Sequence, residues 1–251
     1  MPAHLYVDGY NFYYGVTNHF RRERDLRGYS LSGLCWCDFR ALVERHFLRP
    51  GETLGPIRYF TAEVTGTTAL NTAECHNQHL WLDALRTVPG LDIVYGFHQR
   101  PDPKHGREEK QTDVNLVVEI LLDTLASRQR PSRVFILSAD TDYMPAILAL
   151  EERLDARCPV TILLPPCANP AAYAERYRKT QRELHQRHAP SRPGFPLDVR
   201  PLSEEILANS LLPYTAPTPH GCPPYWRLPA SYLEKMITNP SYHPARKTLH
   251  A

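Results

Sequence analysis

Short apolar segments alternate with stretches of helical periodicity through most of the chain. Five segments are rich in β-branched and aromatic residues, as buried strands are; they are residues 3–7, 57–62, 91–97, 133–137 and 160–164. Between and after them, apolar positions recur with the period of an α-helix. These helical patterns cover residues 38–47, 69–85, 114–125, 143–154 and 171–187. The alternation predicts an α/β fold with a mainly parallel sheet covered by helices on both faces.

Proline becomes frequent after about residue 189. The chain has 24 prolines, and those in residues 190–193, 213–219 and 223–224 do not fit inside long helices. Two short helical patterns remain there, at residues 203–211 and 230–237. We therefore divide the chain into a main domain, residues 1–189, and a proline-rich extension, residues 190–251. We expect the extension to wrap the main domain or to bind a partner.

Composition narrows the class of protein. Of the 251 residues, 42% are hydrophobic, which is typical of a globular chain. No apolar run reaches the roughly 18 residues that a spanning helix needs, and the N-terminus lacks the zones of a secretory signal. We expect a cytoplasmic protein that does not enter a membrane and keeps its six cysteines reduced. The net charge of +2 does not by itself indicate nucleic acid.

Acidic residues follow two predicted strands, and another acid opens a predicted helix. Asp8 ends the first strand, Asp140 and Asp142 follow the fourth, and Asp113 begins the helix at residues 114–125. In parallel sheets, ligands bind outside the carboxyl ends of the strands. We therefore expect these side chains to meet at one edge of the sheet.

Carboxylates crowded at one point repel each other unless a cation neutralises them or one keeps its proton. Oxygen donors select hard cations such as Mg²⁺ and Mn²⁺. Such an ion can ionise a bound water and stabilise a phosphoryl displacement, which is the chemistry of phosphodiester hydrolysis. Asn11 and Ser138 are placed to orient a ligand, and Lys110, in a polar loop before Asp113, is placed to contact phosphate. Glu119 is a weaker candidate, because it lies roughly 240° round the helix from Asp113.

Each acid also has a purely structural interpretation. Asp8 before a glycine is typical of a turn, and Asp142 is typical of a helix cap. Asp113 suits a helix start, where the helix dipole favours negative charge. From the residues alone, a metal site and these structural roles stay equally open, since the three segments are only inferred to meet.

Three motifs resemble the NYN domain family of the PIN-like nuclease superfamily, in order, spacing and strand context. They are VDGYNF at residues 7–12, KQTDV at residues 110–114 and SADTDYMP at residues 138–145. The resemblance covers about residues 3–187. It implies a PIN-like (Rossmann-like) three-layer sandwich with a central sheet of about five strands. Gln111 and Thr112 replace a commoner Gly-Val pair, and Ala139 stands where glycine is usual.

The resemblance implies that Asp8, Asp113, Asp140 and Asp142 are both the catalytic acids and the ligands of Mg²⁺ or Mn²⁺. Glu119 falls where relatives often carry another acid. We therefore expect a metal-dependent RNA endonuclease that cuts single-stranded or structured RNA. Whether the chain forms homo-oligomers, or binds a protein through its extension, stays open.

Two other function classes are kept. One is a non-catalytic RNA- or protein-binding module that retains the fold and the acids. The other is a small-molecule oxidoreductase, since some members of this branch carry oxidoreductase-type names. We favour it less, because no strand is followed by the G-x-G-x-x-G turn of dinucleotide-binding proteins.

Aromatic and basic side chains supply further candidates for contacts with nucleic acid. Four aromatic side chains in and just after the first motif could stack on bases, although at least half of them are expected in the core; they are Tyr10, Phe12, Tyr13 and Tyr14. The segment at residues 176–188 is a basic helix that could follow an RNA backbone, but a solvated helix face is favoured. Cys75, His76 and His79, with Cys35 and Cys37, could form a zinc site. Without a C-x-x-C pair, ordinary structural placement is favoured for them.

Overall fold

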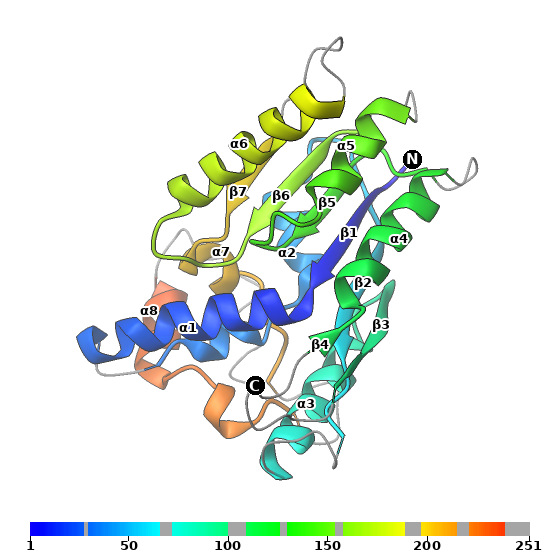
Figure 1. The fold of residues 1–251 in the computed structure, drawn as a ribbon. Helices are drawn as coiled ribbons and strands as arrows, with labels where there is room; N and C mark the ends of the chain where they lie inside the picture. Colours follow the sequence, from blue (N-terminus) through cyan, green and yellow to red (C-terminus); the bar gives the residue numbers. More distant parts are fainter. Residues whose placement is uncertain are drawn as a thin grey trace.

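The structure is a computed structural model that describes residues 1–27, 30–65, 72–99, 109–125, 130–153, 158–188, 197–214 and 221–238. The strands are β1 (Ala3–Asp8), β2 (Leu54–Ala62), β3 (Leu91–His98), β4 (Glu109–Lys110), β5 (Val134–Leu137), β6 (Val160–Leu164) and β7 (Asp198–Pro201). The helices are α1 (Gly9–Arg27), α2 (Phe39–His46), α3 (Thr72–Leu85), α4 (Thr112–Leu125), α5 (Met144–Arg153), α6 (Pro170–His188), α7 (Glu204–Ala208) and α8 (Ala230–Thr238). Two short 3-10 helices, η1 (Ser32–Cys35) and η2 (Pro224–Trp226), complete the described elements (Figure 1).

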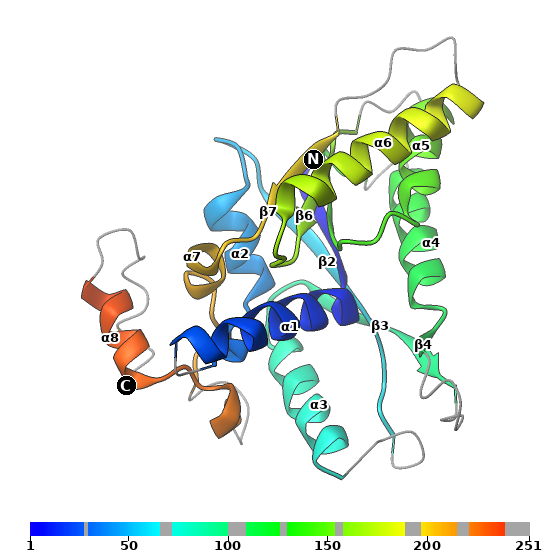
Figure 2. The ribbon, with the colours of Figure 1, turned by 60° about the vertical axis from the view of Figure 1, so that its left-hand side comes forward.

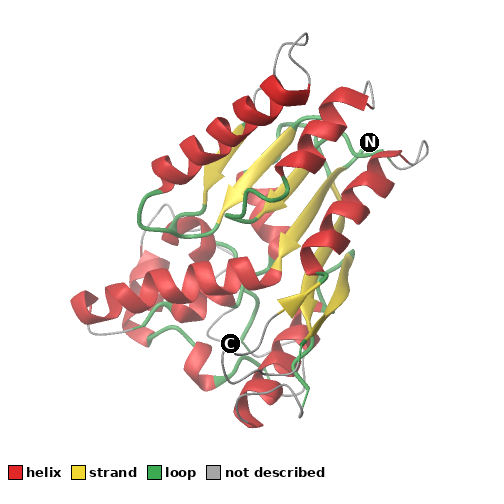
Figure 3. Ribbon diagram, in the orientation of Figure 1, coloured by secondary structure: helices red, strands yellow, loops and turns green. Residues whose placement is uncertain are grey.

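The sheet contains seven strands among the described residues, in the order β4-β3-β2-β1-β5-β6-β7 (Figure 3). All neighbours are parallel except β4, which pairs antiparallel with the end of β3. The expectation of an α/β fold is confirmed, but the estimate of about five strands is too low. The two extra strands, β4 and β7, form the edges of the sheet, where a short strand or a strand ending in proline is tolerated.

The order of the strands divides the helices between the two faces. Numbered among themselves, the six parallel strands lie in the order 3-2-1-4-5-6, which is a doubly wound, Rossmann-like arrangement. Helices α1, α2 and α3 share one hydrophobic core with the sheet, while α4, α5 and α6 share another. In Figure 2, α4 and α5 lie on one side of the strands and α2 and α7 on the other. The direction of winding therefore reverses between β1 and β5.

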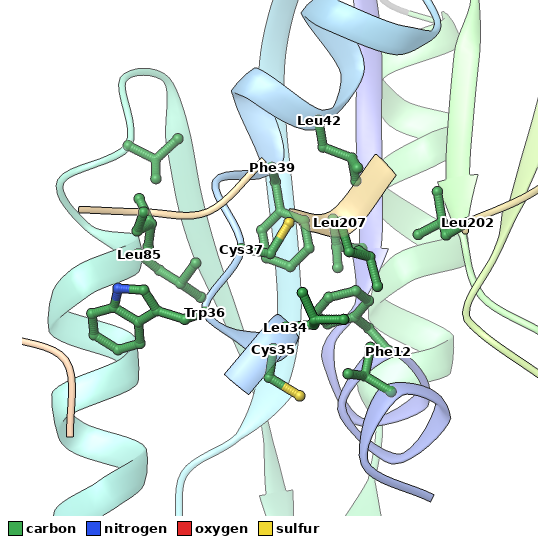
Figure 4. Close-up of a cluster of buried hydrophobic side chains, with 14 of the residues drawn as sticks. Phe12, Leu34, Cys35, Trp36, Cys37, Phe39, Leu42, Leu85, Leu202 and Leu207 are labelled. Atoms are coloured by element: carbon green, nitrogen blue, oxygen red, sulfur yellow. The ribbon is translucent and has the colours of Figure 1, made fainter. Parts of the chain in front are cut away.

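The described part of the proline-rich region packs against the rest of the chain. Strand β7 extends the sheet beside β6, and Leu202, Leu207 and Trp226 lie in the core beneath α1, α2 and α3. Figure 4 shows Leu202 and Leu207 beside side chains from the first 42 residues. The indole N–H of Trp36 donates to the Pro213 carbonyl at 3.2 Å. Residues 197–214 and 221–238 thus pack against the rest of the described chain and close one of its cores.

The predicted strands and helices all have counterparts in the structure, with ends that shift by a few residues. Predicted residues 69–71 and 154, and much of the extension, lie outside the described residues. None of the described helices combines the length and the apolar character needed to cross a bilayer.

Candidate functional site

A cleft of about 880 Å³ opens at the carboxyl edge of the sheet. Its walls come from helices α1 and α6, the start of α4, the end of β3 with β4, and the loops that follow β5 and β6. Asp8, Asp113 and Asp140 all line this cleft. The cleft lies where the winding reverses between β1 and β5, which is where doubly wound sheets bind their ligands. Three acids from distant parts of the sequence therefore share one opening.

Asp8 is fixed by the junction between β1 and α1. Its Oδ1 accepts a hydrogen bond from the Asn11 backbone N–H at 3.0 Å, so the side chain caps the first turn of the helix. Gly9 allows the junction to pass close to β2, because a Cβ there would lie 2.5 Å from the Tyr59 ring and 2.7 Å from the Phe60 carbonyl oxygen. Asp8 is consequently buried, with 9% of its surface exposed.

The Tyr143 hydroxyl lies between two of the acids. It is 2.8 Å from Asp8 Oδ2 and 2.8 Å from Asp113 Oδ1. A phenol carries a single hydrogen, so it can donate to only one carboxylate at a time. The second short contact is satisfied when one carboxyl is protonated and donates to the phenol oxygen. Burial, and to a smaller extent the charge of Asp113, raises the pKa of Asp8 to about 6, so Asp8 can hold this proton at pH values below about 6 and is mostly ionised above it.

Asp140 is placed by a tight turn after β5. Ser138 Oγ donates to Asp8 Oδ2 at 3.1 Å and accepts from the Asp140 backbone N–H at 3.0 Å. Asn11 Oδ1 accepts from the Ala139 N–H at 2.8 Å. Asp140 Oδ1 accepts from the Asp142 backbone N–H at 3.0 Å. Asn11 and Ser138, which we expected to contact substrate, therefore hold the two acid-bearing turns together; Asn11 also lines the cleft.

Asp142, Glu119 and Lys110 do not line the cleft. Asp142 is exposed, and its backbone rather than its side chain supports Asp140. Glu119 lies on the face of α4 that meets β2, with its Oε2 3.6 Å from Arg58 Nε. Lys110 is in β4, where alternate side chains point to opposite sides, and its neighbour Glu109 is the one that lines the cleft. Residues 104–108 of the polar loop lie outside the described residues.

The donor set suits a hard cation, since the three acids offer only oxygen. However, no group of three or more His, Cys, Asp or Glu side chains is arranged to hold a metal in the part of the chain that the structure describes. This covers the suggested zinc cluster as well; within it, Cys75 Sγ lies 3.9 Å from His79 Nε2 and bonds to the Val64 carbonyl. The three acids line one cleft, but the Tyr143 hydroxyl lies between Asp8 and Asp113.

Several residues of the cleft were given no individual role in the sequence interpretation. They are His98, Glu109, Tyr173 and Arg176; Glu109 falls in the polar loop before Asp113, and Arg176 begins the basic helix for which a solvated face was favoured. Tyr143 was quoted within a motif but was given no role. Its position directly after the acid pair was a usable signal. Which carboxylates its hydroxyl would meet depends on the order of the strands, which the sequence does not display.

The raised pKa of Asp8 predicts a pH-dependent stability. Between its ordinary value of 3.8 and about 6, the folded protein binds more protons at Asp8 than the unfolded chain does. The Asp8 contribution to the free energy of unfolding should therefore fall as pH rises through this window and stay level above it. We expect Asp8→Asn to become more stable relative to wild type as pH rises from 4 to 7, by roughly 2 kcal/mol. Urea unfolding with a chelator present, at a series of pH values, measures the difference. A constant difference between the two proteins would refute the assignment.

Comparisons with known proteins give one distant relative. No family model matches the chain. The enzyme named 6-hydroxy-3-succinoylpyridine 3-monooxygenase from Pseudomonas putida is 27% identical in an alignment of 199 positions that covers 64% of this chain and 59% of the relative. The chain thus matches only about three fifths of that protein's length.

Two solved structures are distantly similar. A protein of unknown function from Vibrio parahaemolyticus has a TM-score of 0.43 and 15% identity, covering 81% of this chain and 93% of the other. A UDP-glucosyltransferase from Polygonum tinctorium has a TM-score of 0.32 and 11% identity, covering 72% and 33%. At these scores, neither structure contributes to the interpretation of the cleft.

Proposed function

We propose that this chain is a divalent-cation-dependent ribonuclease of the NYN type, with a PIN-like variant of the doubly wound fold. The observation that carries the proposal is the meeting of Asp8, Asp113 and Asp140 in one cleft at the reversal point of the sheet. These three residues would hold Mg²⁺ or Mn²⁺, which would supply an activated water and offset the charge of the phosphate. An RNA partner, a cytoplasmic location, and oligomerisation or protein binding through residues 190–251 remain predictions.

Some residues of the chain would bind that ion, and others would hold the binding residues in place. Asp8 must lose its proton before it can act as a ligand, and its pKa of about 6 leaves it mostly ionised at neutral pH. Tyr143 keeps Asp8 and Asp113 close together by sharing its hydroxyl between them. Ser138 and Asn11 fix the turn that carries Asp140. The site is thus held by bonds within the protein.

A second candidate function is oxidation of a small aromatic compound, favoured by the relative named as a pyridine monooxygenase. It ranks lower because of the first turn after β1. Dinucleotide cofactors of doubly wound folds place their pyrophosphate against glycines at that turn. Here the turn carries the Asp8 carboxylate, whose charge would repel a pyrophosphate.

One experiment separates these functions. Purified protein is incubated with end-labelled single-stranded RNA and Mn²⁺ or Mg²⁺, with and without a chelator. We expect cleavage that requires the metal. RNA binding without cleavage would favour the non-catalytic module instead. Oxygen uptake with NADH and a hydroxypyridine, in the absence of RNA cleavage, would favour the monooxygenase.

A further inference from the structure

One exposed tyrosine stands in the cleft beside the acids. Tyr14, on α1, lines the cleft and has 47% of its surface exposed. The neighbouring aromatic side chains are held by the protein: Phe12 is buried, and the Tyr13 ring centroid lies 6.3 Å from that of Trp226 and 5.4 Å from that of Tyr14, edge-on to Tyr14 at 71°. Tyr10 stacks on Tyr14, at a centroid distance of 5.9 Å and an interplanar angle of 29°. Tyr14 is therefore the exposed ring among residues 10–14, and it lines the cleft beside the half-buried Tyr10.

Tyr10 gives this ring a rigid support. Its hydroxyl lies 2.6 Å from His98 Nε2 and 3.1 Å from the Ala62 carbonyl oxygen. Tyr10 and Tyr14 are one helical turn apart, so they share a face of α1. A ring that is already positioned loses little conformational freedom when a ligand stacks on it. Tyr14 is thus a preorganised platform for a flat ligand.

A cation lines the same cleft from α6. Arg176 lies there together with Tyr173. Two other arginines of α6, Arg178 and Arg182, form ion pairs with Glu175 on the surface of the helix. The planar guanidinium of arginine suits the oxygens of a phosphate. The cleft therefore combines an aromatic platform, a phosphate-binding group and the three acids.

We propose that the cleft selects single-stranded RNA by stacking one unpaired base on Tyr14 and holding a backbone phosphate with Arg176; the choice of RNA rests on the proposed function. Bases within a duplex are stacked on their neighbours, so their faces are closed to the tyrosine, whereas unpaired bases can be splayed onto an aromatic side chain. Every base has a π-face, so this recognition tolerates any sequence.

Binding is tested apart from cleavage, in an Asp140→Asn background with Mg²⁺, by fluorescence anisotropy of a labelled oligouridylate and of a matched duplex RNA. Tyr14→Ala should weaken binding of the single strand about tenfold and change binding of the duplex much less. Tyr14→Phe keeps the ring and should bind like the parent. Tyr95→Ala is the matched control, because Tyr95 is 39% exposed on β3 and does not line the cleft.

The phosphate contact has its own readout. Arg176→Gln should lower the slope of log affinity against log salt by about 1, as expected for one lost phosphate contact. Arg178→Gln, one residue beyond Tyr177 on α6, is its control. Unchanged single-strand affinity in Tyr14→Ala, or equal losses for single strand and duplex, would overturn the proposal. So would Tyr14-dependent binding of a hydroxypyridine by a protein that does not bind RNA.

The outcomes for binding and for cleavage can be told apart. If the wild-type protein cuts RNA but Tyr14→Ala binds the single strand normally, the proposed stacking on Tyr14 is refuted and the proposed ribonuclease activity is kept. If Tyr14→Ala weakens single-strand binding but neither Mg²⁺ nor Mn²⁺ supports cleavage, the stacking on Tyr14 is kept and the ribonuclease activity is refuted. A thermal melt of each variant confirms that the exposed ring was removed without loss of the fold.

Discussion

Asp140→Asn should lower the rate of Mn²⁺-dependent RNA cleavage by about 100-fold or more. Loss of a group that only supports a metal ligand already costs about 10- to 100-fold, and Asp140 would bind the ion directly. The substitution keeps the Oδ1 that accepts from the Asp142 N–H, so the turn after β5 should persist. Single-turnover cleavage across a range of Mn²⁺ concentrations measures the loss, and higher Mn²⁺ should restore part of the rate.

Two asparagine variants serve as controls for Asp140→Asn. Asp142→Asn should lose less activity, since that side chain is exposed and lies outside the cleft. Asp83→Asn removes one charge from an exposed ion pair with Arg86 on α3, away from the cleft, and should cleave at the parent rate. If Asp140→Asn cleaved RNA at the wild-type rate and still required the metal, Asp140 would have no part in the mechanism.

Trp226→Ala should destabilise the whole protein by about 3–5 kcal/mol, the usual cost of deleting a large buried aromatic side chain. The Trp226 ring is 7% exposed and packs against Trp81 and Trp36, with centroids 5.8 and 5.9 Å away. Because these partners belong to the main domain, the loss should appear as a shift of a single unfolding transition. Urea unfolding followed by far-UV circular dichroism measures it.

Phe97→Ala is the control for this stability prediction. Phe97 is an aromatic residue in the sheet, but 49% of it is exposed, so its removal should change stability by less than about 1 kcal/mol. Two separate transitions in the wild-type protein, with Trp226→Ala affecting only one of them, would mean that the proline-rich region folds independently of the main domain.

The sequence was most informative where a strand is buried on both faces. Residues 3–7 and 160–164 are mostly apolar, each with one polar residue, and the structure places strands there. Strand β7 was not predicted, because Asp198–Pro201 has only four residues at a sheet edge and ends in proline, so its alternation is too short to indicate a strand. Strand β4 has only two residues. Edge strands such as these depend on a neighbouring strand, which a local pattern does not reveal.

In the site too, some residues could be predicted from the local sequence and others depend on how the elements pack. Asp8 and Asp140 could be paired from the sequence, because both follow strands and the carboxyl ends of parallel strands share one edge. The place of Glu119 could not be predicted, because its orientation depends on where α4 crosses the sheet and on Arg58 of β2. Arg176 was predicted only as one of several cations on a basic helix. The packing of α6, which the sequence does not display, decides which of them lines the cleft.

The closure of one core by residues 202–236 has a consequence for a chain that is still being synthesised. Translation delivers β1, α1 and α2 well before Leu202, Leu207, Trp226 and Met236, which complete that core. Until those residues have been synthesised, the hydrophobic surface around Trp36 stays exposed to solvent. Contacts between segments so far apart in the sequence also form slowly. Nascent chains should therefore depend on chaperones until nearly all of this region has left the ribosome.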